Sequence, residues 1–126
     1  VIANNALYSS EGFAVHLVSG RASGATLAGN VGIGGLSGTA SGLAKGLGLR
    51  EDFVDASSDL RPKAGSSLIN AGSRNYVGVD DFDGRARDGV ADAGAFRFSR
   101  TSKPKWIVGP TFKFNLELAR QRKPGR

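Results

Sequence analysis

The sequence predicts an all-β fold, a parallel β-helix in which short strands and glycine-rich corners form stacked coils. Glycine supplies 19 of the 126 residues, roughly twice its share in an average protein. Glycine favours turns between short strands and disfavours long helices. In addition, residues 2–6 match residues 27–31, an offset within the periods typical of solenoid repeats. A coil of this length buries its apolar row only by stacking on a neighbouring coil.

The first two strands are predicted from alternation of apolar and polar residues. After a turn at residues 9–12, residues 13–18 alternate so that Phe13 and Val15 share one face, as in a half-buried strand. Residues 26–33 form the next predicted strand.

The repeat also places asparagine at equivalent positions. Asn5 and Asn30 occupy the same place in the two copies, and each precedes an apolar residue. Stacked strands can align identical amide side chains so that each one bonds the next. We therefore expect the two asparagines to form a ladder, although a chance match in a glycine-rich stretch is the alternative.

The segment from residue 66 to residue 98 contains the most specific motifs. They are Ser-Ser-Leu-Ile-Asn-Ala-Gly at 66–72, Asp-Phe-Asp-Gly-Arg-Ala-Arg at 81–87 and Asp-Ala-Gly-Ala-Phe at 92–96. Together they resemble the C-terminal coils of bacterial right-handed parallel β-helix proteins, the superfamily that includes polysaccharide lyases and glycosidases. This sequence departs from that pattern at three positions, where proline, aspartate and an acidic residue are usual: Ser67, Asn70 and Arg97.

The resemblance implies an exported bacterial protein that is secreted, periplasmic or on the cell surface. It implies the C-terminal fragment of a polysaccharide-degrading or polysaccharide-binding protein, with about three or four coils here and any catalytic coils upstream. Whether the parent is a lyase or a glycoside hydrolase stays open, and we do not expect this segment to be catalytic by itself. The alternative is a non-catalytic adhesive or self-assembling structural module.

Two regions are predicted. Residues 1–99 hold the coils and closing turns, with nine basic and ten acidic residues. Residues 100–126 form a basic extension, with eight basic residues and one acidic residue. Strict alternation predicts a capping strand at 111–118, and a helix over 115–123 is the competing interpretation.

Several classes of protein are excluded or disfavoured by composition. The apolar runs are too short for a membrane-spanning helix, and the absence of cysteine excludes disulfides and thiolate sites. The net charge of +6 comes from the C-terminal extension, so nucleic acid is not the expected partner. The chain has no methionine and begins at Val1, so we expect Val1 to lie inside a longer precursor, in the middle of a coil.

A calcium site is one hypothesis for the acidic turn formed by Asp80, Asp81 and Asp83 beside Gly84. Calcium prefers clustered carboxylate oxygens around a glycine turn. The alternative is a structural turn in which the aspartates bond backbone amides and pair with arginine. A catalytic pair of Asp81 and Asp92 is a weaker hypothesis, because glycoside hydrolysis needs two carboxyl groups across a cleft. No cofactor other than calcium is expected.

Four residues are the candidate polysaccharide-binding residues. They are two arginines of the turn motif, the single histidine and the single tryptophan: Arg85, Arg87, His16 and Trp106. His16 falls on the face opposite Val15, so we expect it to point outward. An aromatic side chain such as Trp106 can stack on a sugar ring, but it is equally suited to packing.

Overall fold

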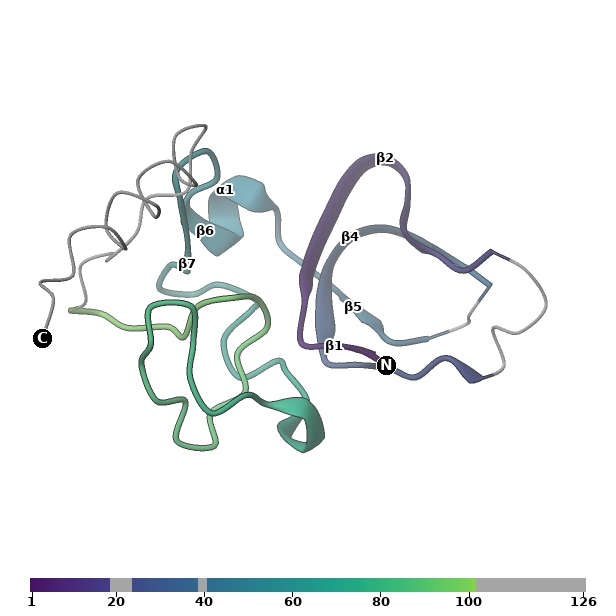
Figure 1. Cartoon of the computed structure of the whole chain (residues 1–126). Helices are drawn as coiled ribbons and strands as arrows, with labels where there is room; N and C mark the ends of the chain where they lie inside the picture. Colours follow the sequence, from purple (N-terminus) through teal and green to yellow (C-terminus); the bar gives the residue numbers. More distant parts are fainter. Residues whose placement is uncertain (19–23, 39–40, 102–126) are drawn as a thin grey trace, which may run out of the picture.

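The computed structural model describes residues 1–18, 24–38 and 41–101, and within them it consists of short strands with little helix (Figure 1). The helical elements are α1 (Leu49–Asp52) and the 3₁₀ helix η2 (Arg74–Tyr76). The strands, in chain order, are β1 (Ile2–Ala3), β2 (Ala6–His16), β3 (Leu27–Ala28), β4 (Asn30–Ser37), β5 (Leu43–Lys45), β6 (Phe53–Asp55) and β7 (Asp59–Pro62).

These strands make three small sheets. β1 pairs with β3 in parallel, and β2, β4 and β5 form a three-stranded parallel sheet in that order. The third sheet is the antiparallel pair β6–β7. β2 is the outer strand of the largest sheet, drawn in purple in Figure 1.

The repeat predicted from the sequence is confirmed as a parallel strand pairing. Ile2 is opposite Leu27 in the first sheet, and Ala6 is opposite Val31 in the second. Both pairs have the same offset along the chain as the two copies of the repeat. The repeated sequence therefore corresponds to two neighbouring strand pairs in register.

The chain turns at the same point in both copies of the repeat. Asn4 lies between β1 and β2 along the chain, and Gly29 lies between β3 and β4. Their φ angles are 57° and 65°, a left-handed conformation that asparagine and glycine tolerate better than other residues. Gly32 is needed for a different reason, since a Cβ atom there would lie 1.6 Å from the Leu7 carbonyl oxygen. Glycine thus allows β2 and β4 to approach.

The predicted turn at residues 9–12 and the predicted alternation after it are wrong in detail. β2 continues through this segment, but its register against β4 shifts between Tyr8 and Phe13 and again between Phe13 and Val15. Such bulges reorient side chains. As a result Phe13 is 55% exposed whereas Val15 is buried, so the two residues do not share a buried face.

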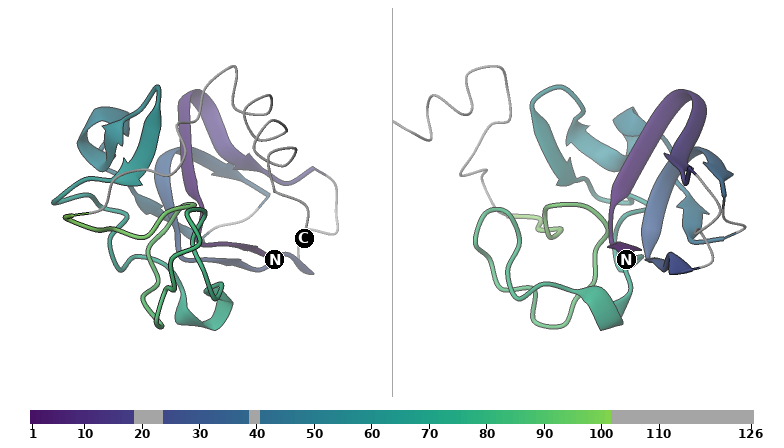
Figure 2. Two further views of the ribbon diagram at one scale, coloured as in Figure 1. Left: turned by 60° about the vertical axis from the view of Figure 1, so that its left-hand side comes forward. Right: turned by 45° about the vertical axis from the view of Figure 1, so that its right-hand side comes forward.

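The predicted right-handed parallel β-helix is also wrong, because the described residues show separate small sheets and no solenoid. The parallel stacking stops at the three-residue strand β5, and α1 and the antiparallel β6–β7 pair follow it. Residues 63–101 then run beside the strands mainly as turns (Figure 2). A single strong repeat was too little sequence to specify further coils.

The core lies where these parts meet. It contains Val31, Phe53, Leu68 and Ala93, packed against partly buried residues that include Tyr8. The described part of the chain has no helix long and apolar enough to cross a membrane. The predicted strand at 111–118, the competing helix at 115–123 and Trp106 lie outside the described residues.

Candidate functional site

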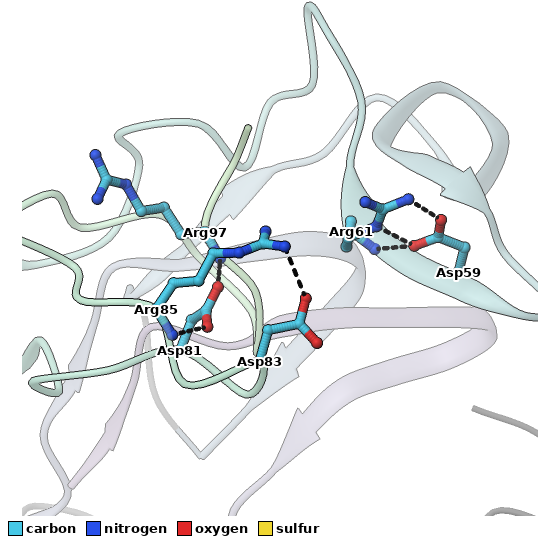
Figure 3. A network of polar contacts seen from close by, with 6 residues as sticks. All are labelled: Asp59, Arg61, Asp81, Asp83, Arg85 and Arg97. Carbon is cyan, nitrogen blue, oxygen red and sulfur yellow. Dashed lines mark hydrogen bonds and ion pairs between the residues drawn. The ribbon is translucent and has the colours of Figure 1, made fainter. Parts of the chain in front are cut away.

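The acidic turn is built by side chains that hold backbone amides (Figure 3). One carboxylate oxygen of Asp81 accepts the Arg85 amide at 2.8 Å, and the other accepts the Arg97 amide at 3.1 Å. The Arg85 guanidinium lies 3.6 Å from the buried carboxylate of Asp83. The structural turn considered from the sequence is therefore present, while Asp80 is exposed.

Side chains also hold backbone groups around Asp92, in the motif that follows the acidic turn. Arg87 is buried and its guanidinium donates to backbone carbonyls, including Asp92 at 3.2 Å and Gly94 at 3.0 Å. The Asp92 carboxylate accepts the amides of Asn70 and Phe98, both at 2.7 Å. These contacts give Arg87 and Asp92 a structural role in the turn region. A polysaccharide-binding role for Arg85 and Arg87 stays a prediction.

The pair Arg61–Asp59 on β7 lies near the same turn (Figure 3). The hydrogen bond from Arg61 to Asp59 raises the pKa of Arg61, burial lowers it, and the negative charges of Asp59 and Asp83 raise it further. The positive charge of Arg61 is therefore balanced by the negative charges of nearby aspartates.

No group of three or more histidine, aspartate or glutamate side chains in the described part of the chain could hold a metal ion. Asp80, Asp81 and Asp83 are close in sequence, but the Asp81 oxygens are directed to backbone amides. A calcium ion would have to compete with these hydrogen bonds. The structure therefore offers no cluster that supports the calcium hypothesis.

Calcium removal is expected to leave thermal stability unchanged, because both Asp81 oxygens already accept backbone amides and a cation stabilises a fold by linkage only when it binds the native state. Thermal unfolding of one protein sample in EDTA and in millimolar calcium measures this directly. A midpoint several degrees higher with calcium, lost again on chelation, would contradict the prediction and restore the acidic turn as a metal site.

His16 points outward, as predicted, and it forms an exposed aromatic pair. Its ring stacks on Phe13 with a centroid distance of 5.4 Å and an interplanar angle of 21°. The register shift next to Phe13 brings these two rings to the surface of β2. Such a flat exposed surface can stack against a sugar ring.

A separate open groove lies between β2, β4 and α1. Its volume is about 360 Å³, within the range of small-ligand sites. The residues that line it are Tyr8, Ser9, Ser10, Ile33, Leu49, Arg50 and Glu51. Ile33 and Leu49 are 39% and 47% exposed, so the groove combines an aliphatic surface with hydroxyl and charged groups.

A buried carboxylate fixes the elements on both sides of this groove. Asp52 at the end of α1 accepts the Tyr8 hydroxyl of β2 at 2.5 Å and the Leu47 amide at 2.9 Å. Its other oxygen accepts the hydroxyls of Ser66 and Ser67, at 3.0 and 2.7 Å. Asp52 thereby connects β2, α1 and the turn that follows β7, and it sets the distance between α1 and β2.

The electrostatics of this pair favour a charged Asp52 and a neutral Tyr8. Burial by itself would raise the pKa of Asp52, but the hydrogen bonds from Tyr8, Ser67 and Gly48 outweigh it and lower the pKa to about 2. Burial and the Asp52 charge raise the pKa of Tyr8 well above its usual value. Both groups therefore serve as fixed hydrogen-bonding partners at neutral pH, and neither is suited to proton transfer.

The residues of this groove could not be recognised from the sequence. Tyr8, Ser9, Ser10, Arg50 and Glu51 carry no recognisable motif. They come together because β2 pairs with β4 and because Asp52 positions α1 beside Tyr8. The three predicted binding residues that the structure describes do not line this groove, and Trp106 lies outside the described residues.

Comparisons with known proteins give no further guide to identity. No family model matches the chain, and neither a curated protein nor a solved structure was found to be similar to it. A function must therefore be inferred from the groove and the surfaces around it.

Proposed function

We propose that this protein is a non-catalytic polysaccharide-binding module that holds an acidic polysaccharide in the groove between β2, β4 and α1. The observation that carries the proposal is the groove itself, which Arg50 lines together with Ser9, Ser10 and exposed aliphatic residues. The resemblance of residues 66–98 to the ends of polysaccharide-acting proteins points to the same class of ligand.

The chemistry of the groove suits a uronate-containing chain. Arg50 is exposed and has no ion-pair partner among the described residues, and a guanidinium matches the geometry of a carboxylate. The Ser9 hydroxyl donates to the Glu11 carbonyl oxygen at 2.5 Å, so it can accept a hydrogen bond from a sugar hydroxyl. A serine hydroxyl such as that of Ser10 can both donate to and accept from sugar hydroxyls. The aliphatic surface of Ile33 and Leu49 can cover the apolar C–H face of a sugar ring.

A neighbouring hollow extends this surface along the sheet. It also includes Ile33 and is lined on the other side by Lys45 of β5. Lys45 is exposed, so two cationic side chains flank Ile33. A polymer that carries a carboxylate on successive units could contact both.

Binding is favoured over cleavage by the carboxylates near the groove. Hydrolysis of a glycosidic bond requires two carboxyl groups on opposite sides of the bond. Glu51 lines the groove, but the Asp52 carboxylate is fully buried and engaged in hydrogen bonds. Among the groove residues that the structure describes, Glu51 is thus the single available acid. Because polysaccharides of this kind are extracellular, we propose that the protein acts outside the cytoplasm.

Arg50→Ala is expected to weaken binding to polygalacturonate about tenfold, which corresponds to roughly 1.4 kcal/mol and to the loss of one charge-assisted hydrogen bond. Isothermal titration calorimetry with polygalacturonate oligomers measures the effect. Arg74→Ala is the matched control, because Arg74 is also exposed but lies on η2, away from the groove.

This pair of variants separates specific from general electrostatic binding, since both remove one positive charge from a protein of net charge +6. The proposal predicts that the Arg74 variant binds like the parent. Equal weakening by both variants, or no binding of polygalacturonate by the parent, would show that the groove is not a polysaccharide site.

A further inference from the structure

Two Asp-Gly dipeptides lie in the segment of turns that follows β7, at residues 83–84 and 88–89. An aspartate followed by glycine can react with its own backbone, because glycine has no side chain to shield its amide nitrogen from the aspartate carboxyl group. Whether this happens in a folded protein depends on how freely the carboxyl group and the nitrogen can meet. The structure places the two dipeptides in opposite environments.

Asp88 and Gly89 form the tip of a tight turn. The Val90 amide donates to the Arg87 carbonyl oxygen at 2.8 Å, and the φ angles of Asp88 and Gly89 are 48° and 74°. Two positive φ angles between such partners define a type I′ turn, for which Asp-Gly is a preferred sequence. The amide that closes this turn belongs to Val90. The Gly89 amide is therefore not used by the turn, and it donates to no acceptor among the residues that the structure describes.

The Asp88 carboxyl group is open to solvent. The Asp88 side chain is 71% exposed, and a Cβ atom added at Gly89 would have no neighbour within 4 Å. The carboxylate accepts a hydrogen bond from the Arg97 guanidinium at 3.1 Å, a contact between partly exposed side chains of a kind that contributes little to stability. The carboxyl group can therefore rotate toward the Gly89 nitrogen without leaving a packed environment.

The other Asp-Gly dipeptide is held on both sides of the reacting bond. Asp83 is 2% exposed, and the Arg85 guanidinium lies 3.6 Å from its carboxylate. The Gly84 amide donates to the Asp81 carbonyl oxygen at 2.9 Å. Reaction at this site would require a local opening that exposes the carboxyl group and breaks the amide hydrogen bond.

We propose that Asp88 is a site of spontaneous isomerisation to isoaspartate, whereas the fold protects Asp83. The Gly89 amide nitrogen attacks Cγ of the Asp88 carboxylic acid, a C–N bond forms, and the hydroxyl group leaves with the amide proton as water. The product is a succinimide ring. Water then opens the ring at either of its carbonyl carbons. Cleavage of the new bond gives back aspartate, and cleavage of the original peptide bond to Gly89 gives isoaspartate.

Isomerisation changes the turn itself. In isoaspartate the main chain runs through Cβ and Cγ, so it gains one carbon atom, and the free carboxyl group is attached to Cα. The hydrogen bond from Val90 to Arg87 that closes the turn cannot keep its geometry around a longer main chain. The site is independent of polysaccharide binding, because neither Asp88 nor Gly89 lines the groove between β2, β4 and α1.

Ageing of the full chain in water enriched in ¹⁸O tests the proposal, because each hydrolysis of a succinimide introduces one ¹⁸O atom. Trypsin cleaves after Arg85 and so separates the two dipeptides, and fragment mass spectra locate the label and the isoaspartate. In the folded protein we expect both to accumulate at Asp88 about tenfold faster than at Asp83, because only Asp83 must first open locally. In urea the two sites should react at similar rates.

Asp88→Glu is the matched variant, since it keeps the carboxylate but would need a larger ring to react, and its peptide should stay unlabelled. Preferential reaction at Asp88 in the folded protein, together with reaction at both sites in urea, supports the proposal. Equal rates at the two sites of the folded protein, or no label at Asp88, would overturn it. So would an Asp83 that stays unlabelled in urea, or an Asp88→Glu peptide labelled like the parent.

Discussion

Replacing Asp52 by alanine is expected to lower the free energy of unfolding by about 3 to 5 kcal/mol, the range found when a buried charged network loses its central group. Asp52 is fully buried and accepts hydrogen bonds from the Tyr8 hydroxyl, three backbone amides and two serine hydroxyls. The variant leaves these donors buried without an acceptor, and each such group costs about 1 to 3 kcal/mol. Urea denaturation followed by circular dichroism measures the change.

The control for this variant is Asp55→Ala, three residues along the chain. Asp55 is exposed and its carboxylate accepts only local hydrogen bonds, from Ser57 and Ser58. Its replacement is expected to shift the urea midpoint far less. Similar shifts for both variants would show that Asp52 does not connect α1 to the rest of the fold.

The same carboxylate makes stability depend on pH. The folded-state pKa of Asp52 is about 2, below the ordinary value of 3.8. A lowered carboxylate pKa stabilises the fold above the unfolded-state value, and this stabilisation is lost as the pH falls through the folded-state value. We expect the contribution of Asp52 to be complete above about pH 5 and to disappear between about pH 4 and pH 2. Asp52→Asn should flatten this part of the stability curve.

Asn30→Ala is expected to lower the free energy of unfolding by about 2 to 4 kcal/mol, because several buried hydrogen bonds are lost together. Asn30 is 1% exposed and forms hydrogen bonds with Asn5 and with two backbone carbonyls. Alanine cannot replace any of them, so donors and acceptors of both neighbouring strands lose their partners. The variant should destabilise the sheets where Asn30 connects the two copies of the repeat.

Asn75→Ala is the matched control for the ladder. Asn75 is exposed on η2. Substitutions at such surface positions usually change stability by less than about 0.5 kcal/mol. Chemical denaturation of the two variants gives the comparison. An Asn30 variant as stable as the Asn75 variant would mean that the ladder contributes little to the fold.

The sequence predicted those features that a repeat or an alternation encodes locally. The internal repeat correctly placed Ile2 opposite Leu27 and Ala6 opposite Val31. Residues at equivalent positions of the two copies lie opposite each other when the copies pair as parallel strands. The contact between Asn5 and Asn30 follows from the same register. The outward direction of His16 was also predicted.

Other features depend on contacts that no local pattern encodes. The exposure of Phe13 results from register shifts between β2 and β4, and alternation alone cannot locate a bulge. The end of the parallel stacking after β5 was missed because one repeat says nothing about the next segment. The groove was missed because Ser9 and Arg50 are distant in sequence and meet only when Asp52 binds Tyr8.

The central claim is that the groove between β2, β4 and α1 binds an acidic polysaccharide. Titration of ¹⁵N-labelled protein with polygalacturonate oligomers, followed by NMR, tests it most directly because each backbone amide reports its own surroundings. We expect the largest, saturable chemical-shift changes at residues 8–10 and 49–51. Changes confined to the basic residues outside the groove, or no saturable change at any concentration, would contradict it.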